Sequence, residues 1–103
     1  EGITSVLNGD KLQLPLTADP ENYRYFELTN GMKVMVARDE ATEKASACLS
    51  ISHGAADDPH NRAGMAHFTE HMLFLGTKAF PKENHYKEYL AKNGGRSNGG
   101  TGQ

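Results

Sequence analysis

Residues 64–76, Gly-Met-Ala-His-Phe-Thr-Glu-His-Met-Leu-Phe-Leu-Gly, place three titratable side chains in an otherwise largely apolar run. The apolar residues recur at helical spacing, which predicts an α-helix. Each residue of an α-helix advances by about 100°, so His67 and His71 lie one turn apart on nearly the same face. Glu70 lies on the flank of that face. Two imidazoles and one carboxylate are therefore expected to project into one sector of the helix.

This H-x-x-E-H spacing suits a zinc site. Two imidazoles one turn apart can supply two nitrogen ligands, and the carboxylate of Glu70 lies where it can act on water beside the metal. A helix that is apolar nearly all round is expected to be buried. Burying three titratable groups is costly unless a partner compensates them, and a metal ion is such a partner. The alternative is that both histidines are neutral, hydrogen-bonded core residues and that Glu70 points to solvent.

Both flanks of this helix carry boundary residues. Asn61 is expected to be its N-cap, and Gly76 is expected to end it. Asp57 and Asp58, shortly before the helix, could ligate a hard cation. No calcium-loop spacing surrounds them, which favours a role in turn formation.

A second helix is predicted over residues 84–93, where two tyrosines and a leucine share one face and two glycines follow. His85 and Glu88 within it are spaced i, i+3, which is compatible with metal binding. An ordinary surface pair is the simpler interpretation. His53 could also be a ligand, but a structural or loop histidine is again the simpler interpretation.

The residues before the helix predicted at 64–76 have sequence patterns typical of β-strands. Residues 23–38 contain two β-prone runs separated by Asn30-Gly31, which predicts a hairpin with a type I′ turn. Apolar and small polar residues alternate over 45–52, which predicts a third strand. Residues 1–22 mix short apolar groups with glycine, proline and aspartate and are expected to form an extended arm.

Composition excludes several classes of function. At 103 residues the chain is one domain at most. Its net charge of −2 offers no basic field for nucleic acid or an anionic membrane. No apolar run approaches the roughly 20 residues of a membrane span. Cys48 is the only cysteine, so an internal disulfide is excluded and a reducing, cytoplasmic location is expected.

Several segments together resemble the inverzincin zinc metallopeptidases of the insulysin and pitrilysin group. Residues 67–77 closely resemble the insulysin zinc helix, and residues 80–84, Phe-Pro-Lys-Glu-Asn, follow at the family's spacing. Residues 30–32 resemble the family's first hairpin, and residues 58–64 resemble the approach to the zinc helix. The resemblance covers about residues 20–98.

The resemblance implies an α+β fold, with helices packed on one face of a mainly antiparallel, mixed sheet. It implies that residues 23–103 are the first half of a metallopeptidase catalytic domain, which is therefore incomplete. His67 and His71 correspond to zinc ligands, and Glu70 corresponds to the general base. Ser97-Asn98 matches the start of a strand that borders the substrate cleft, which makes Asn98 a candidate substrate contact.

Two features depart from the family pattern. The family's third zinc ligand is a glutamate on a later helix, beyond Gln103. Gly99-Gly100 stand where the family usually has alanine and a larger side chain, which weakens the expected edge strand. We therefore expect a zinc-dependent endopeptidase sequence that, as this isolated chain, binds zinc weakly and cleaves little. Its expected partners are peptide or small-protein substrates, together with the rest of a peptidase chain or a second copy.

Three alternatives remain open. A lyase that cleaves ribosylhomocysteine also carries H-x-x-E-H, but its third ligand is a cysteine after the motif, whereas Cys48 precedes it. A non-catalytic family member could serve as an assembly or peptide-holding subunit, although such relatives typically lose motif residues. The chain could also be a short product whose role is binding.

Overall fold

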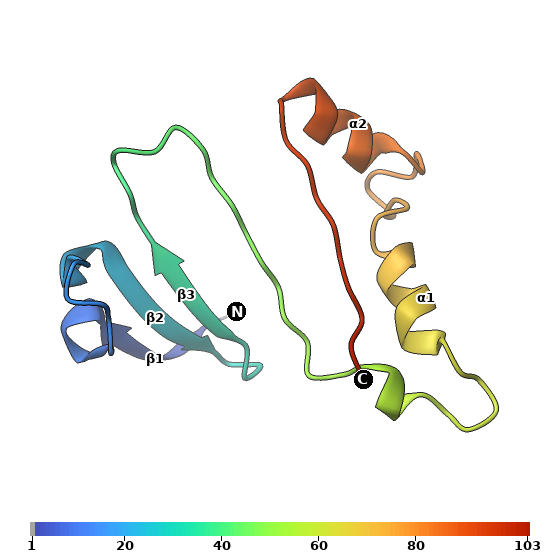
Figure 1. The fold of residues 1–103 in the computed structure, drawn as a ribbon, viewed down its shortest axis with the longest axis horizontal. Coiled ribbons are helices and arrows are strands. Elements are labelled where there is room, and N and C mark those ends of the chain that lie inside the picture. Colours follow the sequence, from blue (N-terminus) through green and yellow to red (C-terminus); the bar gives the residue numbers. More distant parts are fainter. Residues whose placement is uncertain (1) are drawn as a thin grey trace. The chain divides into compact units, whose positions relative to one another are not determined.

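The computed structural model describes residues 2–103, which form two compact units that divide between Ala47 and Cys48 (Figure 1). The first unit holds an antiparallel sheet and the second holds two α-helices. The predicted α+β class and the antiparallel pairing are confirmed. Within residues 2–103, no helix has the length and apolar character needed to cross a membrane.

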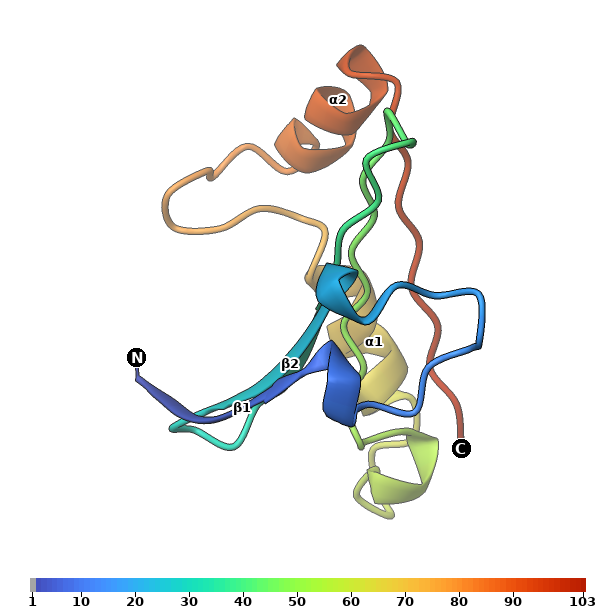
Figure 2. The same ribbon diagram turned by 90° about the vertical axis from the view of Figure 1, so that its left-hand side faces the viewer.

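The sheet of the first unit has three strands in the order β1-β2-β3, namely β1 (Ile3–Asn8), β2 (Tyr23–Leu28) and β3 (Lys33–Ala37). Both neighbouring pairs are antiparallel. Phe26, in the central strand, lies opposite Val6 on one side and Val34 on the other. Such cross-strand pairs of aromatic and β-branched residues stabilise a sheet. The pairing of β1 with β2 is visible in Figure 2.

The β2–β3 hairpin forms as predicted, but its turn is not type I′. That turn needs positive φ at both central residues, whereas only Gly31 has a positive φ, of 83°. The Gly31 N–H donates to the Leu28 carbonyl, and the Leu28 N–H donates to the Met32 carbonyl, both at 2.9 Å. This is the three-residue hairpin in which a left-handed glycine follows a tight turn. The Asn30 side chain accepts from the Met32 N–H, which favours this alternative.

The third strand of the sheet comes from the N-terminal segment. Residues 3–8, within the segment expected to be an extended arm, pair with β2, with an irregularity between Ile3 and Ser5. The strand predicted over 45–52 is wrong, because no ladder partner for this segment lies within residues 2–103. Alternating side chains make a segment suitable for a sheet, but a strand also needs a hydrogen-bonding neighbour.

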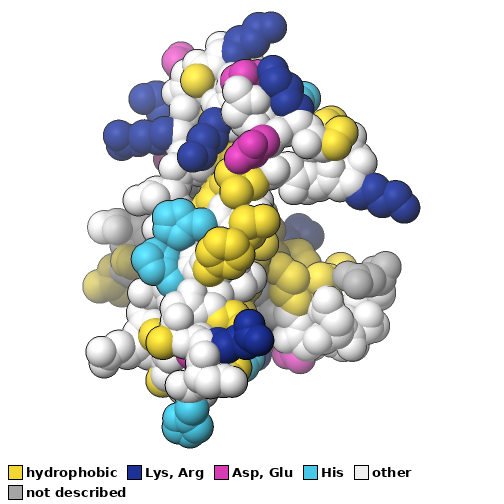
Figure 3. All heavy atoms as spheres, turned by 90° about the vertical axis from the view of Figure 1, so that its right-hand side faces the viewer, with side chains coloured by type: hydrophobic (Ala, Val, Ile, Leu, Met, Phe, Trp, Pro, Cys, Tyr) yellow, Lys and Arg dark blue, Asp and Glu magenta, His cyan; other side chains and the backbone are white. Residues whose placement is uncertain are grey.

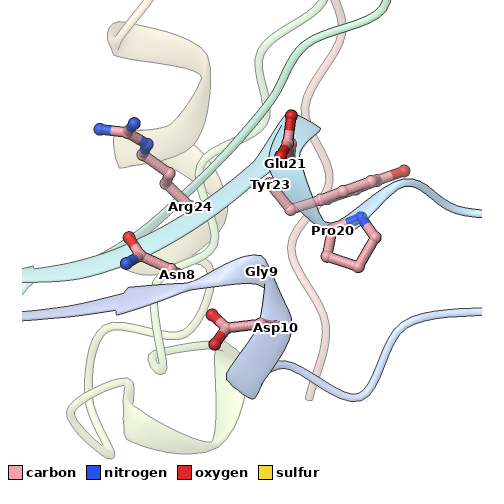
Figure 4. Close-up of a pocket in the computed structure, with 7 residues that line it drawn as sticks. All are labelled: Asn8, Gly9, Asp10, Pro20, Glu21, Tyr23 and Arg24. Carbon is pink, nitrogen blue, oxygen red and sulfur yellow. The ribbon is translucent and has the colours of Figure 1, made fainter.

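A polar hollow lies where β1 and β2 meet the two short helical turns at Gly9–Lys11 and Pro20–Asn22 (Figure 4). Gly9 is buried there, and a side chain at this position would collide with the Pro20 carbonyl. The labelled side chains point in different directions in Figure 4 and do not converge on a common centre. The hollow is lined by Asn8, Gly9, Asp10, Pro20, Glu21, Tyr23 and Arg24.

The second unit contains α1 (Met65–Met72) and α2 (His85–Lys92). The prediction for α2 is confirmed, with Asn84 and Asn93 as its flanking caps. Helix α1 is shorter than predicted. It is followed by single tight turns up to Gly76, which has a φ of 107° and ends them.

The predicted N-cap of α1 is wrong: Asp58, not Asn61, satisfies the first backbone donors of this helix. The two Asp58 carboxylate oxygens accept from the Gly64 N–H at 2.7 Å and the Ala66 N–H at 2.8 Å. The side chain of the N-cap residue normally accepts from an N–H two or three residues further on. The N-cap position of α1 is Gly64, which makes no side-chain cap hydrogen bond. Here a loop folds back over six residues to bring the carboxylate to the helix start, where the helix dipole also favours a negative charge.

Replacing Asp58 by alanine is expected to destabilise α1 by about 1 kcal/mol, because two orphan N–H groups lose their acceptor. The measurement is thermal loss of helical signal in far-ultraviolet circular dichroism. Asn61→Ala is the matched control and is expected to leave the transition unchanged. An equal loss of stability in both variants would contradict the assignment of the cap to Asp58.

Helix α1 is not buried, contrary to the expectation from its apolar sequence. None of its residues is buried, and Phe68 exposes 67% of its surface. Two eight-residue helices offer too little apolar surface to enclose one another. His67 and His71 therefore lie on a solvent-exposed face of the helix. Histidine side chains reach the surface beside hydrophobic side chains on the face drawn in Figure 3.

Candidate metal centre on helix α1

The candidate site begins with the two histidines of α1. Their spacing of four residues places the imidazoles next to each other, with ring centroids 4.8 Å apart and ring planes tilted by 49°. The Nε2 atoms of His67 and His71 lie 3.0 Å apart, so both rings direct the same nitrogen to one place. Both side chains are exposed. A cation approaching from solvent would meet two nitrogen donors already convergent.

Glu70 completes the cluster. The ligand atoms of His67, Glu70 and His71 all lie within 4.8 Å of one another. Within residues 2–103 this is the only group of three or more histidine, cysteine or acidic side chains arranged closely enough to hold a metal ion. Glu70 is half-buried, unlike the two histidines. The alternative in which Glu70 points freely to solvent does not describe this arrangement.

The donor set fits zinc. Zinc accepts imidazole nitrogen at about 2.0–2.1 Å, so two such nitrogens on one ion are at most about 4 Å apart. The observed separation of 3.0 Å satisfies that limit. Two histidines leave coordination positions open for further ligands. Within residues 2–103, no other histidine, cysteine or acidic side chain joins the cluster of His67, Glu70 and His71.

The C-terminal segment of the chain lies against Glu70. The Thr101 hydroxyl donates a hydrogen bond of 2.9 Å to Glu70 Oε2. A side chain added at Gly99 would place its Cβ 2.7 Å from Glu70 Oε1. This segment is also held by the Gly102 carbonyl, which accepts from the Ala55 N–H at 2.9 Å. The carboxylate is therefore contacted by a segment that follows it by about thirty residues and that is fixed to Ala55.

The turn that holds this segment is itself stabilised by Asp57. Its carboxylate accepts from the Gly54 N–H at 2.9 Å, and His53 Nδ1 lies 3.4 Å away. The backbone hydrogen bond from Gly54 lowers the pKa of the Asp57 carboxyl below its ordinary value of 3.8, and the nearby His53 adds to the effect. Asp57 thus serves the turn, as its sequence context predicted.

The stability that Asp57 contributes is expected to depend on pH and to be lost in acid. Its folded pKa is lower than its unfolded pKa, so the contribution is present above the ordinary value of 3.8 and is lost as pH falls through the folded pKa. A carboxyl-carbon NMR titration should give a midpoint below 3.8, with the Gly54 amide shift following it. Asp57→Asn should remove the response of Gly54. A midpoint at or above 3.8 would refute the expectation.

The other candidate ligands lie elsewhere. His53 pairs with Asp57, and the His85 ring lies beside Phe80 in a tilted arrangement with centroids 5.1 Å apart. Glu88 accepts from Lys82 at 2.8 Å, and this bond lowers its pKa. Neither member of the His85 and Glu88 pair belongs to the metal cluster. Asn98 is exposed and directly precedes the glycine that approaches Glu70.

Two residues at this site were not found from the sequence. The sequence predicts a turn role for Asp58 but not its capping of α1, and it gives no indication of the role of Thr101. No local pattern could have identified Thr101, because it lies 31 residues beyond Glu70. Asp58 had a weak signal, since aspartate favours helix starts, but its six-residue distance from Gly64 exceeds the usual cap spacing.

Comparison with known proteins identifies the family. The family model described as insulinase, peptidase family M16, matches residues 33–102, which is more than half of the chain. The insulin-degrading enzyme of Bos taurus is 51% identical over 81% of this chain. The insulin-degrading enzyme of Homo sapiens is 49% identical over 84% of it. A Schizosaccharomyces pombe protein whose name includes "zinc protease" is 40% identical over 93% of it.

The chain covers only part of these relatives. The matched residues make up 8%, 9% and 10% of the lengths of the bovine, human and yeast proteins, respectively. The family match includes both helices and the histidine pair, and it extends over β3. The chain belongs to the insulinase family of peptidases, peptidase family M16.

Proposed function

We propose that this chain carries the metal-binding helix of an insulysin-type zinc endopeptidase. The observation that carries the proposal is the convergence of His67 and His71, with Nε2 atoms 3.0 Å apart and the Glu70 carboxylate beside them. Family membership supports it, since relatives are named as insulin-degrading enzymes and as a zinc protease. The proposed substrates are peptides or small proteins.

Each residue of the cluster has a proposed role. His67 and His71 would hold zinc through their Nε2 atoms as neutral imidazoles. When bound, zinc supplies a Lewis acid that activates water and polarises a carbonyl. Glu70 would accept the proton of the attacking water and deliver it to the amine that leaves. The peptide bond would then be hydrolysed without a covalent intermediate on the protein.

Asn98 would contact substrate next to this cluster. It belongs to the segment that passes Glu70, and its side chain is exposed. The proposed third ligand is a glutamate supplied by a later helix of a longer peptidase chain. With only two ligands of its own, this chain would bind zinc weakly and turn over slowly. A cytoplasmic location is part of the same proposal.

The decisive experiment measures cleavage of a fluorogenic peptide by the chain, with zinc and with a chelator. Slow cleavage that the chelator abolishes and zinc restores is expected for a metallopeptidase. Peptide binding without any zinc-dependent cleavage would instead favour a peptide-holding or assembly module. Cleavage that is insensitive to the chelator would reject the metal assignment.

The sheet edges favour association with other chains. Within residues 2–103, β1 and β3 each have one side without a strand partner. Unpaired backbone donors and acceptors on such edges promote pairing with another strand. We propose that the partner is the remainder of a peptidase chain or, when that is absent, a second copy.

Self-association is therefore expected to rise with concentration in light-scattering measurements. Met35→Lys, on the exposed outer strand, should reduce it, because a lysine on a sheet edge opposes pairing. Leu16→Lys is the matched control, since Leu16 is exposed but lies outside the strands. A chain that stays monomeric at every concentration would contradict the expectation.

A further inference from the structure

The Glu70 carboxylate is approached on both of its oxygens by one segment. The Thr101 hydroxyl donates to Oε2 at 2.9 Å. The backbone at Gly99 comes so close to Oε1 that an added Cβ would lie 2.7 Å from it. An O–H···O distance of 2.9 Å lies within the range of a normal hydrogen bond. Gly99 makes the close approach feasible because it has no side chain.

The segment that makes these contacts is anchored independently of Glu70. The Gly102 carbonyl accepts from the Ala55 N–H at 2.9 Å, next to Thr101 in the chain. Gly54 is buried at this point, and an added Cβ there would lie 2.6 Å from the Gly102 oxygen. The Thr101 hydroxyl is therefore presented from a backbone that is held in place by a hydrogen bond outside the Glu70 side chain.

The burial of Glu70 and Thr101 agrees with a contact between their side chains. Glu70 and Thr101 are both half-buried, whereas the neighbouring residues from Ala91 to Gly100 are exposed. A glutamate side chain on a helix surface normally samples several rotamers, which costs free energy when one geometry is required. A fixed hydroxyl donor at one carboxylate oxygen restricts that sampling.

We propose that Thr101 is a positioning residue for Glu70, holding its carboxylate beside the histidine pair, and that Gly99 provides the room for this arrangement. The proposal rests on the proposed role of Glu70 as the general base. Thr101 does not touch the reacting atoms and acts through the orientation of Glu70. The role extends the cluster on α1 to a residue 31 positions later in the chain.

The test is NMR spectroscopy of the full 103-residue chain without metal. Side-chain couplings should show one dominant Glu70 rotamer, with nuclear Overhauser contacts between Thr101 and the Glu70 methylenes. Thr101→Val removes the donor with little change in shape and is expected to spread Glu70 over several rotamers. Thr101→Ser keeps the hydroxyl and should restore the single rotamer. The amide shifts of α1 should stay unchanged in both variants.

A second pair of variants tests the same contact without removing the hydroxyl. Gly99→Ala should displace the Glu70 carboxylate, because the new Cβ would meet Oε1. Gly100→Ala is the matched control, since a Cβ there meets nothing within 4 Å. If Thr101→Val disturbs the α1 amide shifts, the glycine pair decides the question. Rotamer averaging of Glu70 that is equal in the unmodified chain, Thr101→Val and Gly99→Ala would overturn the proposal.

Zinc titration separates this proposal from the proposed function. The rotamer measurement needs no metal, whereas the function needs zinc at His67 and His71. Zinc binding with no effect of Thr101 on Glu70 would reject the positioning role alone. If zinc perturbs neither His67 nor His71, the metallopeptidase function is rejected. The contact between Thr101 and Glu70 would then have no role in catalysis.

Discussion

Replacing His67 or His71 by alanine is expected to abolish zinc binding by this chain. Among residues 2–103, the site is formed by these two histidines and Glu70, and each histidine supplies one of the two Nε2 atoms that lie 3.0 Å apart. Loss of residues that only support a ligand already weakens metal affinity by about 10–100-fold. Loss of a direct ligand should therefore cost more than about 100-fold. Isothermal titration with zinc measures the difference.

Matched histidine variants make this measurement specific. His60 lies outside the cluster, so His60→Ala should leave the zinc affinity unchanged. The unmodified chain itself should bind weakly, because two ligands do not complete a tetrahedral site. Nanomolar affinity would contradict this, unless His53→Ala or His85→Ala showed that one of these residues had been recruited as a third ligand. Equal affinity in His67→Ala and the unmodified chain would refute the site.

Glu70→Gln is expected to retain zinc binding and to lower peptide turnover by about 10²–10⁴-fold, the usual contribution of a general base. The amide has nearly the same shape as the carboxylate, and its oxygen can still accept from the Thr101 hydroxyl. It cannot take a proton from water. The change therefore isolates proton transfer from geometry. The measurement is the initial rate on a fluorogenic peptide at saturating zinc, over long incubations because turnover should be slow.

Glu83→Gln is the control for this experiment, because Glu83 is exposed and lies outside the metal cluster. It should keep both the zinc affinity and the cleavage rate. Full activity in Glu70→Gln would remove Glu70 from the proposed role. A parallel loss of zinc affinity would instead indicate that its carboxylate is a ligand.

The elements that sequence reasoning predicted correctly depend on local interactions. Helix α2 forms between its two asparagine caps, and the β2–β3 hairpin forms around Gly31. Helical spacing alone places His67 and His71 on one face. Interactions over a few residues decide each of these features, so a short window of sequence contains the information.

The predictions that were wrong depend on more distant partners. Alternation over 45–52 suits a strand, but that segment lacks a ladder neighbour within residues 2–103. Apolar residues on α1 suggested burial, yet burial depends on which other elements cover the helix. The cap of α1 comes from Asp58 through a loop that folds back, not from the nearer Asn61.

Sequence by itself determined the chemistry that α1 can offer, because the helical repeat sets the positions of two imidazoles and a carboxylate. Only the tertiary structure decided how that carboxylate is held. The Thr101 hydroxyl and the backbone of Gly99 reach Glu70 after a separation of about thirty residues, through a segment tied to Ala55. No periodicity relates residues so far apart. Their contact follows from the path of the folded chain.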